Sequence, residues 1–290
     1  MMQTKARIRR QNSLAIIWRR IRKNRMAAIG AFIVFAVVVI AFLAPVISPY
    51  APETQDLYNS LTGPSKDHWF GTDIYGRDIL SRIIWGARVS LSISFTAVVI
   101  SSIIGVLLGA IAAFFGGFLD EVIMRFFDIL LSFPDILLAI AIMAILGSGR
   151  GNLVAAITIY SLPQFARIAR GSVMSEKSKE YVDAARLSGE SEMSILMRYI
   201  LPNSLSPVIV QGTLRIAYAI LIISGLGFLG LGIQPPTPEW GTDLSIARDY
   251  LRIAPHTGIF PGIAIFITVM GFNFFGDGLN EVLNPRMKDR

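Results

Sequence analysis

Six long apolar segments constrain the fold of this chain more than any other feature of its sequence. They cover residues 26–47, 89–115, 121–146, 152–169, 204–229 and 258–279. A helix needs about 20 mainly apolar residues to cross a bilayer, and only helices and closed barrels satisfy their backbone hydrogen bonds there. Proline and glycine inside such segments are tolerated, because neighbouring helices satisfy the freed backbone groups. The sequence therefore predicts an all-α, multi-pass protein of the cell (inner) membrane with six transmembrane helices.

Composition supports the membrane class and argues against catalysis. The chain is 53% hydrophobic and only 16% charged, whereas soluble domains carry about 25% charged residues. It has no cysteine, which excludes disulfides, thiolate metal sites and a cysteine nucleophile. Its two histidines, His68 and His256, are far apart in the sequence. No Ser–His–Asp or paired-carboxylate pattern is evident, so we expect no catalytic residue, no metal site and no enzyme activity in this chain.

Positive charge predicts the orientation of the chain in the membrane. The net charge is +7, and the lysines and arginines concentrate beside the apolar segments, which favours membrane orientation over nucleic-acid binding. Nine of them lie in residues 1–25. Placing that arm in the cytoplasm puts nineteen basic residues inside and seven outside, with Arg215 inside a span. We therefore expect both termini to be cytoplasmic.

The same pattern predicts five regions along the chain. A basic cytoplasmic arm (1–25) precedes an anchor helix (26–47). An external segment (48–88) ends in an amphipathic-looking stretch. A five-helix core (89–280) contains a polar cytoplasmic loop (176–203), and a cytoplasmic tail (281–290) follows. A break between the external segment and the core is expected near Val89.

The polar loop has the pattern of two short helices. The first is predicted over Tyr181 to Leu187 with a stop at Gly189, and the second over Ser191 to Leu201, after which Pro202 is expected to break the chain.

The residues Ala184, Ala185 and Gly189 form a small face that a soluble partner could approach closely. The alternative is a surface helix that only packs on lipid headgroups.

Polar side chains within the apolar segments are candidates for a translocation pathway, because ionisable groups there are costly and usually face a cavity. Asp128 and Asp135 are seven residues apart, hence roughly on one helix face. An ion pair with Arg125 is the alternative for Asp128, and helix packing the alternative for Asp135. Arg215 is expected near the cytoplasmic end of its helix, with a side chain that snorkels. The candidates are Asp128, Asp135, Gln211 and Asn273.

The external segment holds Asp73, Arg77 and Asp78 close together. They could dock an external protein or a partner chain. The alternative is a local salt-bridged turn that holds the amphipathic stretch on the membrane.

Three motifs together give the chain a family resemblance. The pattern Asp183-Ala-Ala-x3-Gly189-x9-Tyr199-x-Leu-Pro202 resembles the EAA loop of ATP-binding-cassette importer permeases, with Asp183 and Tyr199 where the consensus has Glu and Ile. The stretch from Gly71 to Leu91 and the tail from Gly230 onward resemble the dipeptide/oligopeptide/nickel family. The tail closes with Leu283-Asn-Pro-Arg286, where that family usually has Leu-Asp-Pro-Arg. The chain is similar to the C-type subunit of such importers.

The resemblance implies a type I importer permease fold and a set of partners. These are a homologous second permease chain forming a heterodimer, two cytoplasmic ATP-binding subunits, an external peptide-binding protein and the membrane lipid. ATP and magnesium would be bound by the partner subunits, so this chain needs no cofactor, and it has no phosphate-loop motif. The residues implied in ATPase coupling are Glu180, Asp183, Ala184, Ala185, Gly189 and Pro202.

The resemblance implies uptake of dipeptides or oligopeptides, driven by ATP through alternating access. Within the same family, nickel or metallophore complexes, glutathione and oligosaccharides are alternative cargoes. A secondary transporter or channel is the alternative of a different class. It would predict paired repeats or a filter motif, and neither is evident in the sequence.

Overall fold

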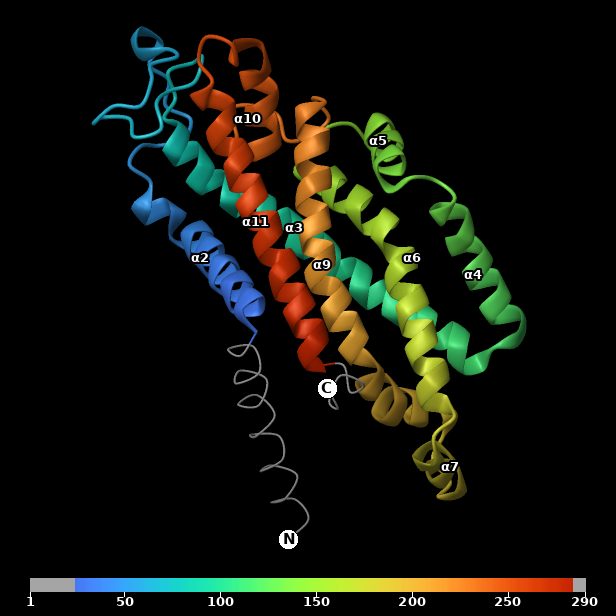
Figure 1. Cartoon of the computed structure of the whole chain (residues 1–290). Coiled ribbons are helices and arrows are strands. Elements are labelled where there is room, and N and C mark those ends of the chain that lie inside the picture. The colour runs from blue at the N-terminus through green and yellow to red at the C-terminus, as the bar shows by residue number, and fades with distance from the viewer. Residues whose placement is uncertain (1–23, 284–290) are drawn as a thin grey trace.

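The computed structural model describes residues 24–283 as a bundle of helices that lie roughly side by side, shown in Figure 1. These residues contain no β-strand. The long helices are α2 (Arg25–Ile47), α3 (Ile79–Phe115), α4 (Gly117–Leu131), α5 (Asp135–Leu146), α6 (Arg150–Lys177), α9 (Leu201–Phe228) and α11 (His256–Leu283). The short ones are η1 (Leu57–Asn59), α7 (Glu180–Leu187), α8 (Glu192–Ser194), the π-helical turn η2 (Ile195–Ile200), α10 (Trp240–Ala247) and η3 (Arg248–Tyr250).

The chain traverses the bundle lengthwise, with α4 and α5 together making one passage (Figure 1). Helix α7 protrudes at one end, called here the α7 end, where α2 begins and α11 finishes. There the Asn24 side chain donates a hydrogen bond to the Glu281 carboxylate. Residues 48–78 and α10 lie at the opposite end, the α10 end. Both ends of the described chain therefore lie on the same side of the bundle as the polar loop.

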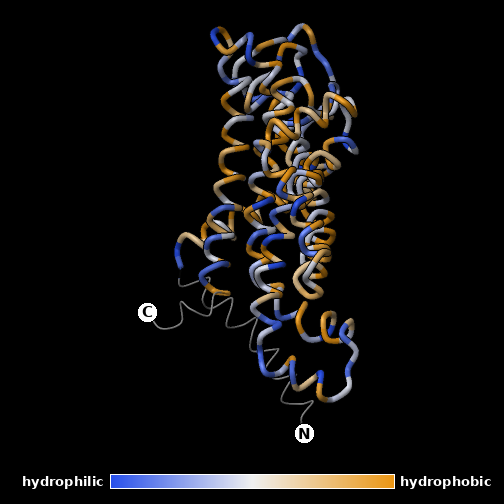
Figure 2. Tube along the Cα trace, turned by 90° about the vertical axis from the view of Figure 1, so that its right-hand side faces the viewer, coloured by the Kyte–Doolittle hydropathy of each residue, from blue (hydrophilic) through white to orange (hydrophobic). Residues whose placement is uncertain are grey.

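Four helices are long and apolar enough to cross a membrane: α2, α3, the continuous helix over residues 192–228, and α11. Helices α4 and α5 are long and apolar enough only together, as a pair bent at a short break. Helix α6 lies against α3 and α9 and carries Arg167 and Arg170, which lower its hydropathy. Figure 2 shows apolar residues prevailing along the long helices and polar ones gathering around the α7 end.

Local capping explains where the helices begin. The Asn24 side chain accepts a hydrogen bond from the Ala27 amide, and the Asp78 carboxylate accepts one from the Ser81 amide, at the first turns of α2 and α3. Between α3 and α4 the chain reverses through Gly116 and Gly117, both at positive φ, a conformation that costs residues with a Cβ.

Small residues let the helices approach closely. At Gly109 of α3, an added Cβ would overlap the backbone of Ala166 on α6, and at Gly278 of α11 it would overlap Ala27 on α2. Membrane helices associate through such small residues, since lipid offers them no hydrophobic driving force. The largest core cluster lies among α3, α6 and α9, with Ile93, Ile157 and Ile223 fully buried.

The predicted third span is wrong as a single helix over residues 121–146. The structure has α4 and α5, bent by 89° at a short break. Pro134 lacks an amide hydrogen and disfavours a helical conformation at Phe133, so α4 ends at Leu131 and α5 starts at Asp135.

The predicted break near Val89 is also wrong, because α3 begins at Ile79 and continues without interruption to Phe115. The amphipathic-looking stretch is thus the first part of a spanning helix, and the boundary between segments 48–88 and 89–280 lies inside it. The anchor helix 26–47 coincides with α2 to within one residue. Three predicted parts lie wholly or partly outside the described residues. They are nearly all of the arm 1–25, the last part of the tail 281–290, and residues 284–286 of the closing motif.

Candidate functional site

Helix α7 of the polar loop has one side anchored to the bundle and the other side free. Val182 and Ala185 are buried in a cluster with Phe114 of α3 and Val173 of α6. Glu180, Asp183, Ala184 and Gly189 are exposed, and the Leu187 side chain is 90% exposed. The six residues implied in coupling are therefore divided: Ala185 packs inward, and the others lie at the surface.

Gly189 ends α7 in a left-handed conformation, with φ at +82°. The Ser188 amide donates to the Ala184 carbonyl and the Glu190 amide to the Ala185 carbonyl, so the last turn is closed by backbone bonds. A Cβ on Gly189 would meet nothing within 4 Å. The space beside Gly189 is therefore open to a partner.

The prediction that Pro202 breaks the chain is wrong. Residues 192–228 are continuously helical, and the π-helical turn η2 precedes the proline. Pro202 has no amide hydrogen to donate. Just after it, two side chains bond back to carbonyls of the preceding turn: Asn203 donates to Tyr199 O (2.7 Å) and Ser204 donates to Ile200 O (2.9 Å). The loop is thus joined rigidly to α9.

Tyr181 ties the loop to the end of α6. Its hydroxyl donates to the Glu176 carboxylate at 2.8 Å. Partial burial, followed by this hydrogen bond, raises the pKa of Tyr181.

A charged pair lies half-way along the bundle. The Arg215 Nη1 atom of α9 is 3.2 Å from the Asp135 Oδ2 atom at the start of α5. The Arg215 guanidinium also lies over the Tyr218 ring, 5.2 Å from its centroid. Arg215 is the fifteenth of 28 residues in α9, about 20 Å from either helix end at 1.5 Å per residue. The snorkelling prediction for Arg215 is wrong, because the side chain pairs with Asp135 and is buried instead.

Gln211 lies near the Asp135–Arg215 pair, and Asn273 does not. Gln211 lies one turn before Arg215, and its amide donates to Gln164 of α6 at 3.4 Å. The Asn273 side chain is exposed on α11. We call the cluster of Asp135, Tyr160, Gln164, Gln211, Arg215 and Tyr218 the midpoint cluster.

Asp128 pairs with Arg167 of α6 at 2.6 Å. The alternative pairing with Arg125 is therefore wrong. Nearby, the Asp120 carboxylate accepts two hydrogen bonds from Arg170, both at 2.7 Å. These side chains line a groove of about 450 Å³ between α4 and α6. The break at Pro134 places Asp128 and Asp135 on two differently directed helices.

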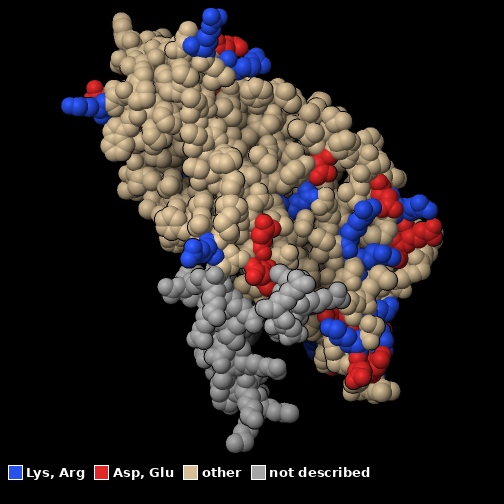
Figure 3. Space-filling model, in the orientation of Figure 1, with Lys and Arg blue, Asp and Glu red and all other residues tan. Residues whose placement is uncertain are grey.

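Figure 3 shows these charges on one face of the molecule. Blue and red groups lie over α4, α6 and α9 along an otherwise tan surface, apart from those at the two ends. Exposed charge at membrane depth is costly against lipid, so this face requires a polar neighbour or a water-filled path.

The predicted external cluster is buried. Asp73, Arg77 and Asp78 are each under 9% exposed. The Asp73 carboxylate accepts from the Tyr75 and Arg77 amides and from Arg77 Nε, and Asp78 caps α3. His68 Nδ1 lies 3.0 Å from the Asp78 carboxylate. This geometry is that of a local salt-bridged turn and leaves these side chains little surface for docking.

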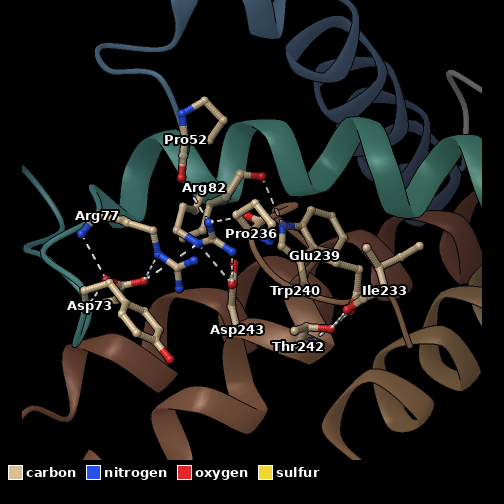
Figure 4. Close-up of polar contacts among 12 residues, drawn as sticks. Pro52, Asp73, Arg77, Arg82, Ile233, Pro236, Glu239, Trp240, Thr242 and Asp243 are labelled. Atoms are coloured by element: carbon tan, nitrogen blue, oxygen red, sulfur yellow. Dashed lines mark hydrogen bonds and ion pairs between the residues drawn. The ribbon is translucent and has the colours of Figure 1, made fainter. Parts of the chain in front are cut away.

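The sequence prediction missed a larger network beside this turn, shown in Figure 4. Arg82 donates to Asp243 of α10 (3.0 and 2.5 Å) and to the carbonyls of Pro52 (3.0 Å) and Pro236 (3.1 Å). The position of Arg82 within an apolar stretch could have indicated that this side chain has a buried partner. Its partners are distant in the sequence, and no local pattern marks them.

Glu239 lies at the centre of the same region and is fully buried. Its carboxylate caps α10, accepting from the Gly241 amide (3.0 Å) and the Thr242 amide (2.8 Å). Burial raises the pKa of Glu239 despite these bonds. The adjacent Trp240 donates from Nε1 to the Ile83 carbonyl of α3 at 3.0 Å. Together they fix α10 across the end of the bundle.

Among residues 24–283, no three histidine, cysteine, aspartate or glutamate side chains are placed to hold a metal ion.

The sequence matches a known transport family over most of its length. Residues 105–289 match the family described as "binding-protein-dependent transport system inner membrane component", and residues 13–64 match the "N-terminal TM domain of oligopeptide transport permease C". The chain belongs to this permease family. It is a multi-pass membrane protein of the importer class.

Two relatives align with nearly the whole length of this permease. It is 46% identical to the dipeptide transport system permease protein DppC of Alkalihalophilus pseudofirmus, over 93% of this chain and 89% of the relative. It is 47% identical to the glutathione transport system permease protein GsiD of Escherichia coli O6:K15:H31, over 93% and 90%.

A solved transporter shares the fold of this permease. The inward-facing MetNI methionine ABC transporter superposes on 71% of this chain and 98% of its own with a TM-score of 0.58 at 18% identity. The predicted importer-permease fold is therefore confirmed.

Proposed function

We propose that this chain is a transmembrane subunit of an ATP-driven importer for dipeptides or oligopeptides. The observation that carries the proposal is α7, a helix anchored by Val182 and Ala185 with its opposite face free. In a permease of this family, that free face would receive an ATP-binding subunit. The relative named as a dipeptide permease supports peptides as the cargo, and the one named for glutathione, itself a peptide, makes glutathione the second candidate.

The complex would contain a second, homologous permease chain, two ATP-binding subunits and an external binding protein. Nucleotide and magnesium would be held by the ATP-binding subunits, and this chain would contribute no catalytic group. The α7 end would face the cytoplasm, in line with the excess of basic residues predicted on that side. Closure of the two ATP-binding subunits would move α7. Val182 and Ala185 of α7 pack in one buried cluster with residues of η2, and η2 runs into α9 without a helix break, so the motion would pass to the membrane part.

A substitution at Gly189 tests the coupling role. Gly189→Arg places a long cation where the space beside α7 is open, so we expect normal insertion and assembly but strongly reduced ATP-driven peptide uptake in proteoliposomes. Gly189→Asn is the matched control, because asparagine tolerates the left-handed conformation and is short. Uptake at the normal rate in Gly189→Arg would remove α7 from the coupling pathway.

The orientation can be measured directly, because the chain has no cysteine of its own. A single cysteine at exposed Leu187 should react with an impermeant maleimide only from the cytoplasmic side. Labelling from the outside of intact cells would reverse the proposed topology.

A further inference from the structure

The midpoint cluster has unused binding capacity, which distinguishes it from an ordinary structural ion pair. The Asp135–Arg215 contact is a single hydrogen bond of 3.2 Å. A guanidinium has five N–H donors, and among the described residues Arg215 uses one of them in a hydrogen bond. Its other nitrogens are not among the fully buried atoms that lack partners, so they are accessible from outside the chain.

A second observation at the same place points to a ligand. The Tyr160 hydroxyl of α6 has no hydrogen-bond partner among residues 24–283, although Tyr160 is only 1% exposed. Its ring is edge-on to the Tyr218 ring, with 6.2 Å between the ring centroids, and the Arg215 guanidinium lies over that same Tyr218 ring. An orphaned buried hydroxyl costs free energy, so a group that bonds to it from the cluster would be favoured.

The cluster is reachable from the polar face described above. The side chains of Asp135 and Arg215 are 18% and 7% exposed, and Tyr218 is exposed at 36%. The Tyr218 ring beneath the guanidinium and the bond to Asp135 restrict the orientations of the Arg215 side chain. A planar guanidinium held in this way matches a carboxylate with two parallel hydrogen bonds.

We propose that the Asp135–Arg215 pair is a substrate site that opens for dipolar molecules carrying both an ammonium and a carboxylate group. The proposal rests on the proposed peptide import and names the chemical groups that this step of transport would recognise. The substrate carboxylate would bind Arg215, with Tyr160 as an additional donor, and the ammonium would bind Asp135.

Charge balance is the reason that a dipolar ligand suits this pair. Separating a partly buried ion pair leaves two charges without a partner, which costs free energy. A dipolar substrate supplies one new partner to each ion, so no charge remains unpaired. A substrate with a single charge leaves either Asp135 or Arg215 without a partner.

The test uses the reconstituted complex with its binding protein and three forms of one dipeptide, dialanine: with both termini free, N-acetylated, and C-amidated. In Arg215→Gln, uptake of the two forms that keep a carboxylate should fall about tenfold more than uptake of the amidated form, the size expected for one charge-assisted bond. In Asp135→Asn, uptake of the two forms that keep an ammonium should fall about tenfold more than uptake of the acetylated form.

Each rate is divided by the wild-type rate for the same peptide, which removes the preference of the unchanged binding protein. The control is Arg248→Gln, an exposed arginine at the α10 end beside Asp249, which should leave the ratios among the three peptides unchanged. Equal fractional losses for all three peptides in both variants would overturn the proposal. The pair would then have only a structural role, linking α5 to α9. Should Arg215→Gln fail to assemble, Asp135→Asn alone decides, because its substrate pattern is specific.

A different result separates this inference from the function on which it rests. If the wild-type complex hydrolyses ATP in response to its binding protein but takes up none of the three peptides, dipeptide import is refuted, and the assignment of this site to dipeptides with it.

Discussion

Two arginines within spanning helices, Arg82 and Arg215, are buried to similar degrees and bonded in opposite ways. Arg82 is 2% exposed and makes four hydrogen bonds, two to Asp243 and two to backbone carbonyls. Arg215 is 6% exposed and makes one. A guanidinium that uses four of its five donors, called here saturated, holds its neighbours in one arrangement, whereas one that uses a single donor, called unsaturated, can exchange its partner. The number of bonds, rather than burial, separates a structural arginine from a candidate binding group.

The largest effect is expected when the saturated arginine is removed. Arg82→Met leaves Asp243 buried without its main partner, which costs about 3 to 5 kcal/mol for a buried pair. We expect poor membrane insertion or a strongly lowered unfolding temperature, measured by tryptophan fluorescence in detergent. Arg88→Met on the same helix is the control, because Arg88 is exposed. Equal stability of the two variants would contradict the structural role of the Arg82 network.

A smaller loss of stability is expected at the unsaturated arginine. Arg215→Gln removes one hydrogen bond and leaves Asp135 partly exposed, so the cost should be about 1 to 2 kcal/mol. Its unfolding temperature should lie clearly above that of Arg82→Met in the same assay. The comparison breaks down if both substitutions destabilise the protein alike.

The smallest expected effect is a dependence of stability on pH. It arises from the buried carboxyl of Glu239, at the start of α10. Burial raises the pKa of the Glu239 carboxyl above its ordinary value of 4.5. Below 4.5 the carboxyl is protonated in both the folded and unfolded chains and contributes nothing. As the pH rises from there towards the folded-state pKa, only the unfolded chain releases its proton, so stability falls.

The measurement compares wild type with Glu239→Gln across that window, from pH 4.5 to 7. The wild type should lose more stability over this range than the variant, whose side chain does not titrate. Identical pH profiles would show that the folded environment leaves this carboxyl unperturbed.

Much of the fold was predictable from local sequence, and the tertiary pairs were not. Hydropathy placed five of the six passages, and helix propensity with Gly189 placed α7. The bend after Leu131 was also readable from Pro134, but the apolar run on both sides of it favoured a single helix. The terminal arm and tail remain predictions.

The ion-pair partners of Arg82 and Arg215 could not be predicted from the sequence. Arg82 and Asp243 are 161 positions apart, and Arg215 and Asp135 are 80 apart. Sequence rules for charges near membranes consider one helix at a time, and therefore placed Arg215 at an interface. Only the packing of α9 against α5 supplies the carboxylate that holds it at the midpoint. In the polar loop, the burial of Ala185 depends similarly on contacts with α3 and α6.

The close packing of α2 against α11 has a consequence for how the protein is made. These are the first and last described helices, and Gly278 of α11 contacts Ala27 of α2 with no room for a side chain. During synthesis α2 enters the bilayer long before its partner has been translated. Until α11 is made, the face of α2 that packs on it therefore stays exposed to lipid, and this contact forms only after α11 has left the ribosome.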